Sequence, residues 1–210
     1  MTKSVTSPAD FWYPKFDTQE YIFGKTPNTF LMAVIPPAAL SELGQTAYAP
    51  ADGEGRNGVY LAQIGYQVTS VDIAANAVDK ARQLAADHGV HINAYVGDVL
   101  EAAPAQFDVV IVSFMHFRAA DHKRFVDHLI SALKPGGLLA IEGYSLDQIP
   151  LASGGPKSEE MLYKREKLAD DFKELDIILL QDTKRQLNEG PRHQGEAATV
   201  QLVARKAVPS

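Results

Sequence analysis

From about residue 45 onward, short runs rich in β-forming residues alternate with segments of helical periodicity. The strand-like runs lie at residues 47–50, 67–71, 91–96, 107–112 and 138–143. This alternation is typical of strand–helix–strand units, which build a parallel sheet because each crossover returns the chain to the same edge. The spacing leaves room for one helix in each crossover.

Apolar residues recur at helical spacing in two of these crossovers. The first stripe covers residues 74–85 and is followed by Gly89, a residue suited to a helix C-terminal cap. The second covers residues 125–133 and is stopped by Lys134-Pro135-Gly136-Gly137, a strong turn signal. Both segments are therefore predicted as helices that end before the next strand.

The chain ends with a different pattern. Ser158, followed by two glutamates, predicts a helix that begins there and runs to about residue 172. Two β-like runs, 175–185 and 197–206, then follow and are separated by the loop 186–196 rather than by a helix. This ending predicts an antiparallel hairpin.

The N-terminal segment, residues 1–40, is rich in aromatic residues and punctuated by proline, so it is predicted to form a cap on a core at residues 41–210. Composition supports one globular domain, with 46% hydrophobic and 22% charged residues in a chain of 210. No apolar run reaches the roughly 20 residues that a membrane helix needs, and the N-terminus lacks the apolar stretch of a signal peptide. We therefore expect a soluble, cytoplasmic protein without a membrane partner.

Charge and cysteine content narrow the chemistry. The net charge is −6, with 20 basic against 26 acidic residues, so the surface repels phosphate backbones and no nucleic-acid partner is expected. The chain has no cysteine, which excludes disulfides, zinc–thiolate sites and a cysteine nucleophile. The histidines show no metal-ligand spacing, so no metal is expected.

Residues 51–58, ADGEGRNG, form a glycine-rich loop between a predicted strand and a helix. Glycines let the backbone approach a ligand closely, and the helix N-terminus presents free amides to negative charge. Gly53 to Gly58 spells GxGxxG, and Asp72 ends the next strand about 20 residues later, where an acid binds ribose hydroxyls. Because NAD and S-adenosylmethionine both carry an adenosine ribose, the loop alone also permits a NAD-dependent oxidoreductase.

Three further features separate these two cofactors. Gly97-Asp98 follows the third strand, LKPGG (133–137) precedes the fifth, and a hairpin closes the chain. Together they resemble class I S-adenosylmethionine-dependent methyltransferases. The resemblance implies an α/β, Rossmann-like, seven-stranded sheet that is mostly parallel with an antiparallel last strand, helices on both faces and an N-terminal helical cap. It also implies S-adenosylmethionine as cofactor and S-adenosylhomocysteine as product.

The family pattern, carried onto this sequence, assigns parts of the cofactor to particular residues. The loop 52–55 surrounds the methionine part, Asp72 holds the ribose diol, Asp98 bonds the adenine amine, and Ser113 lines the methyl-transfer end. The cofactor-binding residues expected on this basis are Asp52, Gly53, Gly55, Asn57, Asp72, Ile73, Asp98, Val99, Ser113, Trp12 and Phe23.

The glycine loop departs from the family at two positions. The pattern (D/E)xGxGxG would place an acid at position 49 and a glycine at position 51, but both are alanine. Asp52 could replace the missing acid by reaching the sulfonium or ammonium group, or it could be a solvated loop carboxylate. The two alanines leave open a non-enzymatic S-adenosylmethionine-binding protein.

Several short segments resemble a narrower group. Trp12, Lys15, Phe16, Phe23 and Gly24 resemble the WxxRW…F segment of thiopurine-type and tellurite-resistance-type methyltransferases. GEGRN (53–57), EGYS (142–145), GGPK (154–157) and EGxxHxG (189–195) resemble bacterial tellurite-resistance-related proteins. The resemblance implies methyl transfer to a small molecule such as a thiol or chalcogen species, which needs no strong base.

Two histidines are candidate catalytic residues. His116 lies just past the fourth strand, where a neutral imidazole could accept a proton or orient the nucleophile, and His193 lies in the loop of the terminal hairpin. A structural role is the alternative for each. Arg56 could bind the cofactor carboxylate or form a surface salt bridge. No apolar stripe indicates an oligomer interface, so the oligomeric state stays open.

Overall fold

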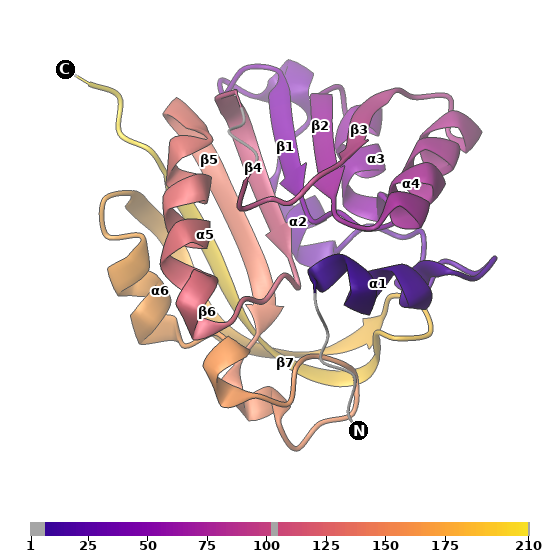
Figure 1. Cartoon of the computed structure of the whole chain (residues 1–210). Helices are drawn as coiled ribbons and strands as arrows, with labels where there is room; N and C mark the ends of the chain where they lie inside the picture. Colours follow the sequence, from indigo (N-terminus) through magenta and orange to yellow (C-terminus); the bar gives the residue numbers. More distant parts are fainter. Residues whose placement is uncertain (1–6, 102–104, 210) are drawn as a thin grey trace.

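The computed structural model describes residues 7–101 and 105–209 and contains a seven-stranded sheet of order β3-β2-β1-β4-β5-β7-β6 (Figure 1). The strands are β1 (Thr46–Pro50), β2 (Gln67–Asp72), β3 (Ile92–Val96), β4 (Phe107–Ser113), β5 (Leu133–Tyr144), β6 (Asp176–Asn188) and β7 (Gln194–Arg205). The first five are parallel, and β7 inserts antiparallel between β5 and β6. The predicted Rossmann-like fold class, mostly parallel with an antiparallel last strand, is confirmed.

Helices cover both faces of this sheet (Figure 1). They are α1 (Pro8–Phe16), α2 (Thr29–Val34), α3 (Arg56–Gln63), α4 (Ala75–Asp87), α5 (Ala119–Ser131) and α6 (Arg165–Asp171), with short 3₁₀ turns at Ala38–Leu40, Leu146–Gln148 and Glu159–Met161. Side chains alternate along β1, so Ala47 and Ala49 pack in the core beneath α2, α3 and α4, while Tyr48 packs in the core beneath α5 and α6.

The N-terminal segment contributes α1 and α2, and residues 1–6 of the predicted cap lie outside the described part of the chain. Helix α1 packs against α4, which follows β2. Helix α1 therefore lies at the end of the sheet where β1 and β2 finish, while Pro36 and Ala38 bond to Tyr66 and Ile64 just before the start of β2. Across the described residues, no helix is both long enough and apolar enough to span a membrane.

The predicted helix over 158–172 is wrong as a single element. A 3₁₀ turn at Glu159–Met161 is separated from α6 by residues 162–164, of which Leu162 and Tyr163 are buried. The Tyr163 amide donates to Tyr144 O at 2.9 Å and its hydroxyl donates to Met115 O at 2.6 Å. These contacts with the ends of β5 and β4 outweigh the local helical preference.

The predicted loop 186–196 is also wrong, because β6 and β7 continue through most of it. Their pairing extends to Asn188 opposite Gln194, so only Glu189 to His193 form the hairpin tip. The turn predicted at 134–137 is a bulge within β5, where the register against β4 shifts and Gly136 adopts a φ of +80°. The connection between β6 and β7, residues 189–193, is therefore shorter than the predicted loop 186–196.

Candidate functional site

The glycine loop leaves the carboxyl end of β1 and turns into α3. Its turn uses left-handed backbone at Ala51 (φ +50°), Gly53 (+58°) and Gly55 (+88°). A Cβ on Gly55 would lie 2.6 Å from the Cβ of Ala81 in α4, so only glycine fits there. Ala51 stands where the family pattern has its first glycine, and it keeps the left-handed conformation that favours glycine.

Asp72 lies at the carboxyl end of β2 and is tied to this loop. Its Oδ2 accepts the Gly53 amide at 2.9 Å and its Oδ1 accepts the Ala74 amide at 2.9 Å. Burial raises the pKa of Asp72, although the backbone donors act in the opposite direction. Ile73, the next residue, is half-buried beside the carboxylate. An acid and an apolar side chain thus border the glycine loop.

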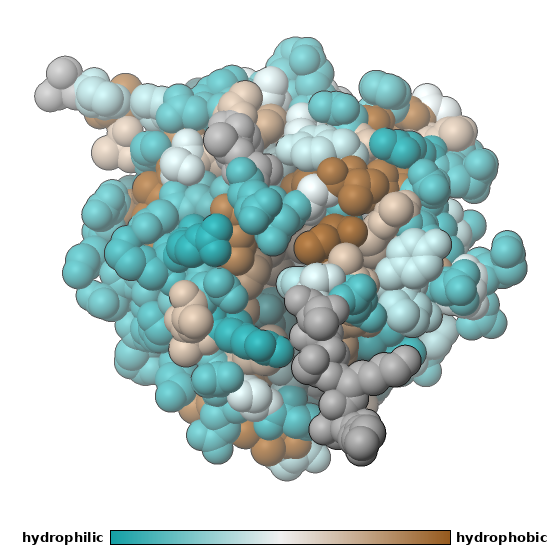
Figure 2. Space-filling model, viewed as in Figure 1, coloured by the Kyte–Doolittle hydropathy of each residue, from teal (hydrophilic) through white to brown (hydrophobic). Residues whose placement is uncertain are grey.

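Asp98 follows β3, the neighbouring strand. Its Oδ1 accepts the Leu100 amide at 2.9 Å, its side chain is half-buried, and Val99 beside it is buried. Val96, the last residue of β3, is 49% exposed. Figure 2 shows hydrophobic residues exposed on the face of the molecule that is turned toward the viewer in Figure 1. The two carboxylates, Asp72 and Asp98, therefore stand at the ends of adjacent parallel strands.

Asp52 faces away from this group. Its carboxylate accepts the Gly58 amide at 3.1 Å and the Ser70 hydroxyl at 3.3 Å, which places it between α3 and β2. Burial raises the pKa of Asp52 to about 7, with Gly58 and Ser70 opposing the shift. The side chain thus stabilises the start of α3 rather than extending from the open end of the loop.

Aromatic residues of the N-terminal segment lie over the glycine loop. Phe16 is 3% exposed, and its ring is 3.5 Å from the position that a Gly53 Cβ would occupy. Trp12 stacks on Phe16 with 5.8 Å between ring centroids, and Phe23 lies 6.1 Å from Phe16. The start of α4, Ala74 and Ala77, completes this small apolar cluster.

Two asparagines connect the glycine loop to the end of β4. Asn57 Oδ1 accepts the amide of Asn28 at 2.9 Å, and Asn28 Nδ2 donates to Ser113 Oγ at 3.4 Å and to Glu142 Oε2 at 2.5 Å. Asn28 also caps α2 by accepting the Leu31 amide. Asn57 therefore acts through Asn28, which holds the predicted methyl-end residue Ser113.

A buried ion-pair network, which sequence reasoning missed, runs from β5 to α3. Arg185 Nη2 lies 2.7 Å from both Glu142 Oε2 and Glu189 Oε1, and Arg56 Nη1 lies 2.6 Å from Glu189 Oε2. Burial raises the pKa of Glu189, but the guanidinium groups of Arg56 and Arg185 outweigh it and hold the pKa at about 2. Glu142 and Glu189 lie in the segments EGYS and EGxxHxG, but no sequence pattern predicts that they form ion pairs with Arg185 and Arg56.

His193 lies in the hairpin tip among three aromatic rings. Its ring centroid is 4.6 Å from Phe23, 4.6 Å from Phe114 and 5.7 Å from Tyr144. Among the described residues its Nδ1 has no hydrogen-bond partner, since Glu189 Oε2 is 3.9 Å away. Burial lowers the pKa of His193, so the imidazole is neutral near pH 7. Phe114, directly after β4, has a strained φ of +53°.

His116 has both ring nitrogens engaged with the backbone. Its Nδ1 donates to Met161 O at 2.8 Å, and its Nε2 accepts the Tyr144 amide at 3.2 Å. Burial lowers the pKa of His116 to about 4. In this arrangement the imidazole connects the end of β5 to the 3₁₀ turn at Glu159–Met161, and both ring nitrogens are occupied by these backbone hydrogen bonds.

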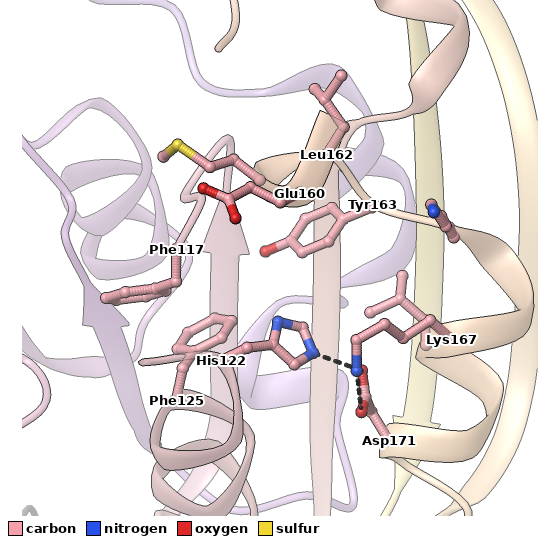
Figure 3. A pocket seen from close by; sticks show the side chains of 11 residues that line it. Phe117, His122, Phe125, Glu160, Leu162, Tyr163, Lys167 and Asp171 are labelled. Carbon is pink, nitrogen blue, oxygen red and sulfur yellow. Dashed lines mark hydrogen bonds and ion pairs between the residues drawn. The ribbon is translucent and has the colours of Figure 1, made fainter. Parts of the chain in front are cut away.

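A separate small hollow lies between α5, α6 and the turn at Glu159–Met161 (Figure 3). There His122 Nε2 lies 2.6 Å from Asp171 Oδ2, and Lys167 Nζ lies 2.9 Å from Asp171 Oδ1. Phe117, Phe125 and Tyr163 supply its aromatic lining. The hollow shares no lining residue with the glycine loop or the rings around His193.

The sheet order, the glycine loop after β1 and the acid at the end of β2 define the Rossmann-like methyltransferase fold. Two carboxylates on adjacent strand ends, with an apolar side chain beside each, fit the hydroxyl and amine donors and the flat ring of an adenosine group. Residues 51–137 match the family model of the methyltransferase domain. This match supports S-adenosylmethionine as the cofactor, in agreement with the sequence prediction.

Known proteins similar to this chain carry several acceptor types in their names. The tRNA 5-carboxymethoxyuridine methyltransferase of Escherichia coli K12 is 27% identical over 135 residues, covering 59% of this chain and 52% of that protein. The ubiquinone biosynthesis O-methyltransferase of Xanthomonas euvesicatoria is 33% identical over 95 residues, covering 44% and 39%. The chain thus spans about half the length of the first relative.

Among solved structures, TehB from Haemophilus influenzae superposes with a TM-score of 0.66 at 16% identity, covering 94% of this chain and 66% of that one. At this identity the likeness concerns the fold. It gives no information on the acceptor.

Proposed function

We propose that this protein transfers the methyl group of S-adenosylmethionine to a small-molecule acceptor, with a thiol or chalcogen nucleophile as the leading class. The observation that carries the proposal is the hydrogen bond from Gly53 to Asp72, which joins the glycine loop to the acid at the end of β2. The match of residues 51–137 to a methyltransferase domain favours methyl transfer over hydride transfer to NAD.

The proposed cofactor site uses the predicted residues at the ends of three strands. Asp72 would hold the ribose hydroxyls, and Asp98 would accept the adenine amine, with Ile73 and Val99 against the ring. Gly53 and Gly55 would let the methionine part approach the loop backbone. When bound, the cofactor would supply an electrophilic methyl group on a sulfonium, whose positive charge favours nearby aromatic faces such as Phe23.

The proposed acceptor site is the group of rings around His193. Phe23, Phe114 and Tyr144 enclose the imidazole, so the site would exclude water and favour a compact, weakly solvated nucleophile. The neighbouring carboxylates Glu142 and Glu189 are paired with arginines and are poor candidates for a general base. A neutral His193 would orient the acceptor or take its proton.

The net charge of −6 and the enclosed ring group favour a small molecule over a nucleic acid. A tRNA acceptor, as in the name of the Escherichia coli relative, is the alternative outcome of an acceptor test.

Cofactor binding tests the first part of the proposal by isothermal titration calorimetry with S-adenosylhomocysteine. We expect binding by the natural protein, loss of binding in Asp72→Ala and weaker binding in Asp98→Ala. Asp79→Ala is the matched control, because the Asp79 side chain is exposed on α4 and, within the described residues, forms an ion pair with Arg82 alone. Absence of binding by the natural protein, or equal binding by Asp72→Ala, would overturn the proposed site.

A further inference from the structure

Residues 17–28, here called the strap, connect α1 to α2 and run between the glycine loop and the hairpin tip. The Phe23 amide donates to Glu54 Oε2 at 3.3 Å, and Ile22 O accepts the Arg192 amide at 3.0 Å. The backbone of Gly24 packs directly on that of Gly190. The strap is therefore fastened on one side to the glycine loop and on the other to the hairpin tip.

Lys80 of α4 is the point where strap and glycine loop meet. Its Nζ lies 2.8 Å from Glu54 Oε1 and donates to Glu20 O at 2.8 Å. The hydroxyl of Tyr21 donates back to Lys80 O at 3.0 Å. One ammonium group thus bridges the loop carboxylate and the strap backbone.

This bridge is mostly shielded from water. The Glu54 side chain is 2% exposed, and Lys80 is its only ion-pair partner in the part of the chain that the structure describes. A buried carboxylate strongly favours its ammonium partner, because unpaired charge in a poorly solvated site is costly. The strap and the loop are therefore expected to separate only when this contact breaks.

The strap also carries the aromatic cluster. Helix α1 precedes it, and Phe16 at the end of α1 contacts the Gly53 position. Moving the strap would move this ring away from the loop that is proposed to bind the methionine part of the cofactor.

We propose that Lys80 is a positioning residue that latches the strap over the bound cofactor through Glu54 and Glu20, and so sets how slowly the cofactor leaves. This inference rests on the proposed function. Lys80 touches neither the proposed ribose site nor the ring group around His193, so it acts through the strap. Its loss would speed release without removing a proposed cofactor contact.

The sequence supplies its own reporter, because Trp12 is the only tryptophan and lies in α1 against Phe16 and Phe23. Stopped-flow tryptophan fluorescence would follow S-adenosylhomocysteine binding and its displacement by excess S-adenosylmethionine. The test variant is Glu54→Gln with Lys80→Met, which removes both charges and leaves no unpaired carboxylate. Lys123→Met is the control, since Lys123 forms an exposed ion pair with Asp127 in α5.

We expect the double variant to release S-adenosylhomocysteine about tenfold faster, the size expected for losing a hydrogen bond to a charged group. The control should keep the natural rate, and thermal unfolding should show that the variants are folded. If the double variant does not fold, Tyr21→Phe must still raise the release rate, by a smaller factor. An unchanged release rate in a folded variant would overturn the proposed role of Lys80 alone. A natural protein that binds no S-adenosylhomocysteine would overturn the latch together with the proposed function.

Discussion

The Nη1 atom of Arg56 lies 2.6 Å from Oε2 of Glu189, and both side chains are buried. Arg56 begins α3 directly after the glycine loop, while Glu189 lies in the hairpin tip, 133 positions further along the chain. The contact connects the proposed cofactor and acceptor ends of the site. Loss of this carboxylate would leave the buried Arg56 guanidinium without its ion-pair partner, and it would leave Arg185 with Glu142 alone.

Glu189→Gln should therefore destabilise the protein by about 3 kcal/mol at pH 7, the lower end of what breaking a buried ion pair costs. The pKa of Glu189 is about 2, below its ordinary 4.5, so the ionised form stabilises the fold above pH 4.5 and this contribution is lost as the pH falls toward 2. Urea unfolding at pH 7 and pH 3 should show a smaller difference between variant and natural protein at pH 3. Glu174→Gln, an exposed change, is the control, and a gap that stays constant with pH would contradict this prediction.

Asp52 predicts the opposite pH dependence. Burial raises its pKa to about 7 from 3.8, so the folded protein binds a proton that the unfolded chain has lost, and stability falls as the pH rises between these values. Asp52→Asn removes the charged form and should raise the melting temperature more at pH 8 than at pH 5. Calorimetric scans at the two pH values measure this, with the exposed Asp127→Asn as control. Equal shifts at both pH values would show that Asp52 does not titrate in this range.

Ala51 offers a test of backbone strain in the glycine loop. Its φ of +50° is unfavourable for alanine and neutral for glycine. Ala51→Gly should stabilise the protein by about 1 kcal/mol. Ala49→Gly is the matched control because Ala49 lies in β1 with ordinary φ, and it should destabilise instead. Chemical denaturation of both variants measures their free energies of unfolding. If Ala51→Gly destabilises the protein as Ala49→Gly does, Ala51 is not strained.

The sheet was predictable because each parallel strand carries its own local signal. The runs before Asp72 and before Asp98 carry β-branched and aromatic residues and are bounded by loop residues, so their ends could be located from sequence. Alternation with helical stripes then implied the crossovers. The predicted strand boundaries then placed Asp72 and Asp98 at strand ends.

The missed features depend on contacts between distant segments. Tyr163 interrupts the predicted helix because its hydroxyl and amide bind the ends of other strands. Likewise, no sequence pattern pairs Glu189 with Arg56, since the hairpin tip meets α3 only after the sheet is assembled. The position of Asp52 in the glycine loop predicts that it reaches the cofactor. The loop backbone instead turns its carboxylate toward Ser70, and the spacing of residues along the chain does not show this turn.

We expect His193 and His116 to have different roles. His193→Gln is expected to lower kcat by about 100-fold if His193 takes or orients the acceptor proton, while leaving S-adenosylhomocysteine affinity unchanged. His116→Gln should mainly lower the melting temperature, because His116 joins two backbone segments. Steady-state kinetics, calorimetry and thermal unfolding on both variants give the comparison. A kinetic defect confined to His116→Gln would reverse these roles.

The most direct test of the central claim is product analysis by mass spectrometry after incubation with S-adenosylmethionine and a panel of acceptors. The panel should contain a thiol, selenide, tellurite, an amine, a phenol and tRNA, with Asp72→Ala as the inactive control. The account predicts S-adenosylhomocysteine together with a methylated thiol or chalcogen, absent in the control. Methylation of tRNA alone, or binding of the cofactor with no methylated product from any acceptor, would contradict it.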